Sequence, residues 1–133
     1  METLTIQTRR RNEFVDVTPL VRESLRTSGV TSGVGVVYCP HTTAAITINE
    51  NADPDVVHDL LLWLERTIPH EQPGFRHGEG NSDSHIKASL VGSSATVIVD
   101  DGDLVLGRWQ GVYFCEFDGP RQRSVHVQWL ASA

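Results

Sequence analysis

Residues 34–49, VGVVYCPHTTAAITIN, decide the fold because they hold two short apolar runs on either side of a polar junction. The runs Val34–Cys39 and Thr43–Asn49 have the length and the apolar, β-branched composition of buried strands. Pro40 and His41 lie between the runs. The stretch therefore predicts two strands whose junction carries a histidine.

The same kind of pattern predicts further strands on both sides of this stretch. Alternation marks one at Leu4 and Ile6, and Asp101-Gly102 predicts a hairpin turn. The other predicted strands cover residues 14–17, 95–99, 104–106, 112–117 and 124–130. We expect a single domain over residues 1–133, with an α+β fold that is a largely antiparallel two-layer β-sandwich with about three helices.

Three segments predict helices. Thr18 as N-cap and Pro19 at the first helical position open one that ends near Gly29. Asp53-Pro54 opens the clearest helix, which runs to about Ile68. A short helix covers about 84–90.

The helix that follows Asp53 has a wide apolar arc. Leu62 and Trp63 lie outside its core stripe, which is formed by Val57, Leu60, Leu61, Leu64 and Ile68. Such a helix is either covered on two sides or contributes to a subunit contact.

Composition excludes several classes of protein. A formal net charge of −6 argues against a nucleic-acid partner, whose phosphates require neutralising cations. No stretch reaches the roughly 18 apolar residues of a membrane span. Cys39 and Cys115 both lie in strand-like runs and form no CxxC motif, so we expect reduced thiols in a cytoplasmic protein.

The polar segment HGEGNSDSH, residues 77–85, predicts a metal site. His77 and His85 enclose Glu79, and glycines allow the backbone to turn so that both imidazoles can converge. His41 can supply a third ligand, and three histidines with an open position are typical of catalytic zinc. Spacing alone leaves a second interpretation open, in which these histidines are surface or hydrogen-bonded residues.

Other residues are candidates for catalysis and anion binding. Glu50 ends an apolar strand near the histidines and could act as a general base. Arg121 follows a turn and could bind a phosphate or carboxylate, with Arg108 and Lys87 as alternatives.

Taken in order, three blocks resemble a known family. HTTAAITINENADPDV (41–56), HGEGNSDSHIKASLVG (77–92) and GRWQGVYFCEFDGPR (107–121) look like the signature blocks of the YjbQ-like family, often labelled secondary thiamine-phosphate synthase. The resemblance implies an α+β sandwich that assembles as a homotrimer. It also implies a site built from His41, His77 and His85 that is often occupied by a metal.

The resulting functional expectation is a metal-assisted enzyme that acts on small phosphorylated metabolites. The resemblance implies a transferase that joins a pyrimidine diphosphate to a thiazole phosphate with release of pyrophosphate. His41, His77 and His85 would hold a divalent metal, with zinc expected. Glu50 or Glu79 would move protons, and Arg121 or Lys87 would bind phosphate. The alternatives are a metal-dependent hydrolase and a non-catalytic metal- or metabolite-binding trimer.

Overall fold

The chain folds into two antiparallel sheets and three helices, which confirms the predicted α+β sandwich. The computed structural model describes residues 1–133. The larger sheet contains, in spatial order, β1 (Glu2–Gln7), β8 (Gln122–Ala131), β3 (Gly33–Tyr38), β5 (Ser94–Asp100) and β6 (Asp103–Leu104). The smaller sheet contains β2 (Glu13–Asp16), β7 (Gln110–Glu116) and β4 (Ala44–Glu50). The helices are α1 (Thr18–Ser28), α2 (Pro54–Thr67) and α3 (Ser82–Val91).

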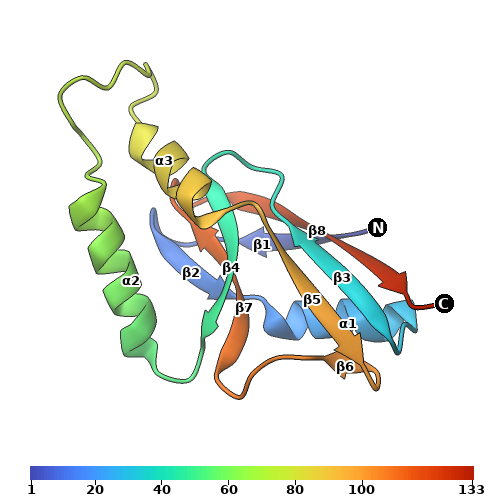
Figure 1. Cartoon of the computed structure of the whole chain (residues 1–133). Coiled ribbons are helices and arrows are strands. Elements are labelled where there is room, and N and C mark those ends of the chain that lie inside the picture. Colours follow the sequence, from blue (N-terminus) through green and yellow to red (C-terminus); the bar gives the residue numbers. More distant parts are fainter.

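The main hydrophobic core lies where α1 packs against both sheets (Figure 1). Val21 and Leu25 from α1 are almost fully buried there. The larger sheet contributes mainly valines and the smaller sheet contributes Ile46 and Phe114. Trp129 of β8 lies over Gly35 of β3, where even a methyl group would overlap its ring.

The two strands expected around His41 are confirmed, and they belong to different sheets. β3 ends at Tyr38 in the larger sheet, and β4 begins at Ala44 in the smaller one. Residues 39–43 therefore cross from one sheet to the other, so His41 lies on a connection between the two layers.

Short sequence motifs correctly predicted several helix and turn boundaries. Asp53 is the N-cap of α2 and accepts a hydrogen bond from the amide of Asp55 at 2.9 Å. Asp101 and Gly102 both have positive φ, as the tight β5–β6 hairpin requires. The expected N-cap role of Thr18 is wrong, because its hydroxyl accepts instead from the amide of Val112 at 2.8 Å.

Helix α2 lies at the edge of the molecule, and a long loop joins it to α3 (Figure 1). Leu64 is its only buried residue, whereas the Trp63 side chain is 61% exposed. Val57, Leu60, Leu61 and Leu62 are only partly buried, so the rest of the chain covers the wide apolar arc incompletely. No helix is both long and apolar enough to cross a membrane.

A buried ion pair joins the two sheets. Arg123 of β8 donates through Nε to Glu116 Oε1 at 2.9 Å and through Nη2 to the other carboxylate oxygen of Glu116, the last residue of β7. The same carboxylate accepts from the Thr8 hydroxyl at 2.8 Å and from the Asp118 amide at 3.1 Å. Arg123 also donates to the Thr43 hydroxyl at 2.9 Å. Both charges are thus hydrogen-bonded within the chain, as buried charges require.

Replacing Glu116 by Gln should strongly destabilise the fold, because it leaves the buried Arg123 without a counter-charge. We expect the free energy of unfolding in urea, followed by tryptophan fluorescence, to fall by about 3–5 kcal/mol. Asp103→Asn is the matched control, because it breaks an exposed pair with Arg22 and should change the free energy little. Equal losses in the two variants would contradict the proposed importance of the buried pair.

Candidate functional site

Three segments meet at one end of the two sheets. The antiparallel register of β4 and β7 places Ala44 opposite Glu116. The connection that carries His41 and the β7–β8 turn that carries Asp118 therefore lie at the same end of the smaller sheet. Helix α3 packs beside the start of β4, where the Ile46 amide donates to the Gly92 carbonyl at 3.0 Å.

A polar cavity of about 300 Å³ lies among these segments, and none of its lining residues is hydrophobic. The lining consists of Pro40, His41, Thr42, Thr43, Glu79, Asn81, His85, Asp118, Arg121 and Arg123. We call this space the polar cavity. Two further hollows adjoin His85, one lined by Phe75, Arg76, His77 and Ile86, the other by His41, Thr42, Ala88 and Ser89. His85 thus lines the polar cavity and both of these hollows.

The predicted histidines gather at this end of the molecule. The rings of His77 and His85 are 5.2 Å apart between centroids, and Glu79 Oε2 lies 3.8 Å from His77 Nε2. Imidazole and carboxylate groups are ligands that suit a divalent ion such as zinc. No three His, Cys, Asp or Glu side chains stand together as a ready metal site, so the three-histidine centre stays a prediction.

His41 is held differently from the other two histidines. Its Nε2 accepts a hydrogen bond from the backbone amide of Ser124 in β8 at 2.9 Å. Burial and, next, the positive charge of Arg123 lower the pKa of His41 below its usual value. The ring is therefore neutral at physiological pH.

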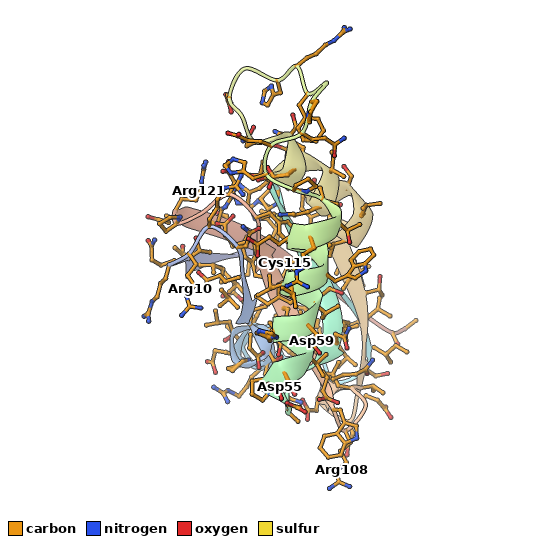
Figure 2. The ribbon with its side chains drawn as sticks, turned by 90° about the vertical axis from the view of Figure 1, so that its left-hand side faces the viewer. Arg10, Asp55, Asp59, Arg108, Cys115 and Arg121 are labelled. Atoms are coloured by element: carbon orange, nitrogen blue, oxygen red, sulfur yellow. The ribbon has the colours of Figure 1, made fainter.

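The two arginines of the polar cavity differ in how freely they can reach a ligand. Arg123 is buried, and its Nε and Nη2 donate to Glu116 and Thr43. Arg121 is half-exposed, although its Nε donates to the Asp118 carbonyl at 2.9 Å and its Nη2 to the Asp118 carboxylate at 3.2 Å. Arg121 is thus the more exposed of the two arginines, and its binding of an anion stays a prediction. Figure 2 places Arg108, its predicted alternative, at the opposite end of the molecule.

Asn81 is a member of the site that sequence reasoning did not assign a role. It is 93% buried, and its Nδ2 donates to Asp118 Oδ2 at 2.8 Å. That bond orients the amide and leaves Oδ1 as the one buried side-chain oxygen without a partner in the chain. Its place between Gly80 and the start of α3 is the sequence signal that could have identified it.

Two predicted residues lie away from the polar cavity. Glu50 is at the far end of β4, where its carboxylate accepts from the Asp53 amide at 3.2 Å. Lys87 is buried on the inner face of α3, where its ammonium lies 3.2 Å from Asp83 and 3.3 Å from Asn12 Oδ1. Within one chain Glu50 therefore lies apart from the histidines, and Lys87 is committed to an internal ion pair. Their catalytic roles stay predictions.

Comparison with known proteins identifies the fold family. Residues 2–132 match the family model described as UPF0047 protein YjbQ-like. The chain belongs to this family. It is 52% identical to the UPF0047 protein YugU of Bacillus subtilis over 130 residues, which cover 98% of each chain. It is 54% identical to the UPF0047 protein MJ1081 of Methanocaldococcus jannaschii over 123 residues, which cover 92% of this chain and 88% of that one.

Solved structures of similar proteins share the architecture. A crystal structure of a YjbQ/UPF0047 family protein from Clostridium acetobutylicum matches with a TM-score of 0.95 at 51% identity, covering 98% of this chain and all of that one. A protein from Aeropyrum pernix matches with a TM-score of 0.92 at 38% identity, covering 99% of this chain and all of that one. The names of these YjbQ-like relatives specify no reaction.

The internal pairing of Asp83 in this YjbQ-like chain predicts a pH dependence. Burial opposes ionisation of Asp83, but hydrogen bonds and charges from Arg11 and Lys87 outweigh burial and hold its pKa below the usual 3.8. The unfolded chain therefore takes up this proton first as the pH falls. The free energy of unfolding contributed by Asp83 is present above pH 3.8 and is lost as the pH falls through the lowered pKa.

This prediction is tested by measuring the free energy of unfolding at several pH values between about 5 and 2 and determining its slope against pH. Asp83→Asn should flatten this slope, whatever its effect on stability at neutral pH. Asp100→Asn is the control, because Asp100 is exposed and should leave the slope unchanged. An unaltered slope in the Asp83 variant would contradict the assignment.

Proposed function

We propose that the chain is a metal-assisted enzyme that acts on small phosphorylated molecules in the polar cavity. The observation that carries the proposal is the position of His85, which lines this cavity beside Arg121 and also pairs with His77. A metal-capable histidine pair and an anion-capable arginine therefore border the same space.

The charge balance of the polar cavity supports a requirement for an added cation. Its lining contains two carboxylates, Glu79 and Asp118, and two guanidinium groups, Arg121 and Arg123. These four formal charges sum to zero, so the protein alone offers a phosphate dianion no net positive charge. A divalent ion held by His77 and His85 would supply it, since a bound cation is often the largest local charge in a site.

The chain's own residues have separable roles in this proposal. Arg121 would bind a phosphate oxygen through its guanidinium, which Asp118 holds in place. Glu79 is the carboxylate next to His77 and would move a proton there, a role for which Glu50 lies too far away. The metal, when bound, would stabilise the negative charge that develops on a leaving phosphate or pyrophosphate.

The reaction to test first is the one that the family resemblance implies. A pyrimidine diphosphate would transfer its pyrimidine to a thiazole phosphate and release pyrophosphate. The polar cavity could take the diphosphate, and the adjoining hollow beside Phe75 and Ile86 could take an apolar ring. Hydrolysis of a phosphorylated small molecule remains the enzymatic alternative for the same groups.

Replacing His77 or His85 by Ala should remove the metal and the activity together. We expect zinc affinity to fall by more than about 100-fold, because even the hydrogen-bond partners of metal ligands contribute about 10–100-fold. Bound zinc would be measured by elemental analysis after dialysis, and turnover by release of pyrophosphate from the two substrates. His58→Ala is the control, because His58 is exposed on α2.

The outcomes separate the hypotheses. Retention of zinc and turnover in both alanine variants would contradict the site assignment. Loss of zinc in the variants, with no turnover in the parent protein, would favour a metal-binding protein over an enzyme.

We further propose that the chain assembles as a homotrimer through the incompletely covered apolar arc of α2. A hollow on this helix is lined by Val56, Asp59, Leu60 and Trp63, and Trp63 is 61% exposed. An exposed tryptophan beside partly exposed apolar neighbours is typical of an association surface.

Trp63→Glu should therefore dissociate the assembly, because it places a charge in the proposed apolar contact. The parent should show a mass three times the 14.7 kDa of one chain in analytical ultracentrifugation, and the variant a smaller mass. Glu65→Gln, a change at another exposed position of α2, should leave the mass unaltered. A monomeric parent would contradict the trimer.

A further inference from the structure

The His41 ring completes the edge of a β-strand. β3 pairs with β8 only as far as Tyr38 opposite His126. The same register would place residue 40 opposite Ser124, but β3 has ended there and Pro40 begins the crossover. The Ser124 amide, without a strand carbonyl, donates instead to His41 Nε2 at 2.9 Å. The imidazole thus takes the place of a missing backbone acceptor.

This bond determines which nitrogen of His41 carries the proton. An imidazole nitrogen that accepts a hydrogen bond uses its lone pair and bears no proton, so the neutral ring must carry its proton on Nδ1. A nitrogen that binds a metal also needs a free lone pair. In this arrangement Nε2 is occupied by Ser124 and Nδ1 is protonated, so neither nitrogen can coordinate a metal.

The remaining polar group of His41 is therefore a donor. Its Nδ1 has no hydrogen-bond partner in the chain and is not among the buried unpartnered atoms. The residue lines the polar cavity together with Arg121 and Thr42. A neutral N–H beside a guanidinium suits an oxyanion, since both groups donate and neither accepts.

We propose that His41 binds a phosphate oxygen as a neutral Nδ1–H donor and is not a metal ligand. The inference rests on the proposed function for the presence of a phosphate and of a metal held by His77 and His85. It divides the three histidines into a metal pair and an anion donor.

The tautomer can be tested on the parent protein by long-range ¹H–¹⁵N NMR of the histidine rings. We expect His41 to show a protonated Nδ1 and an unprotonated Nε2, both before and after addition of zinc. The ring nitrogens of His77 and His85 should shift when zinc is added. A His41 nitrogen that loses its proton or shifts like a ligand on zinc addition would overturn the proposal.

Two amide variants separate the two nitrogens. In His41→Asn the amide nitrogen lies near the position of Nδ1, and in His41→Gln the amide lies near that of Nε2. Isothermal titration of the zinc-loaded proteins with pyrophosphate should show affinity within about threefold of the parent for His41→Asn. For His41→Gln it should be weaker by roughly 10-fold or more, the effect of losing a hydrogen bond to a charged group. Both variants should retain zinc.

The outcomes distinguish this proposal from the proposed function. Loss of zinc in both amide variants would make His41 a ligand and overturn the inference, while the metal-assisted function would stand. A parent that binds zinc but not pyrophosphate would overturn the donor role. A parent that binds no zinc would overturn the proposed function, and pyrophosphate titration of the metal-free variants would then decide the role of His41.

Discussion

The end of the molecule that holds the polar cavity depends on the buried contact between Glu116 and Arg123. These residues belong to different sheets, so their bidentate hydrogen bonds fix how the layers meet at that end. The same two side chains reach Thr8, Thr43 and the amide of Asp118. These contacts hold the start of β4 next to the start of the β7–β8 turn. They thereby also position the cavity-lining residues that these two segments carry.

Both arginines at this end have a carboxylate partner before any ligand arrives. Arg123 is balanced by Glu116, and Arg121 is balanced by Asp118. Such pairs keep the site formed without a ligand, but they also leave no surplus positive charge to attract an anion. Asn81 Oδ1 is the exception, since it is a buried acceptor that nothing in the chain satisfies. The groups of the site are thus held in place before a ligand binds. What the chain does not supply is a net positive charge and a donor for Asn81 Oδ1.

Local patterns predicted the elements well because they depend on neighbouring residues only. Alternation identified β1 and β8, and Asp53-Pro54 identified the start of α2. Long-range partners were beyond such reasoning. Nothing near Lys87 in the sequence shows that Asn12 would meet its ammonium. Glu50 follows His41 closely in sequence, yet the length of β4 carries it to the opposite end of the smaller sheet. The histidines were predicted because their segment is polar and glycine-rich, whereas the role of Arg123 depends on the register between sheets.

Helix α3, which carries His85, has an inner face of unusual composition. Asp83, Ser84, Lys87 and Ala88 are its buried residues, and Arg11 completes the ionic contact with Asp83. The helix is therefore positioned by matched charges more than by apolar area. Loss of Asp83 leaves Arg11 and Lys87 without their shared carboxylate, whereas loss of either cation leaves Asp83 paired with the other. A joint replacement of all three by apolar residues can be tolerated. We therefore expect Asp83 to change in homologous chains only together with Arg11 and Lys87, while either cation alone is freer to vary.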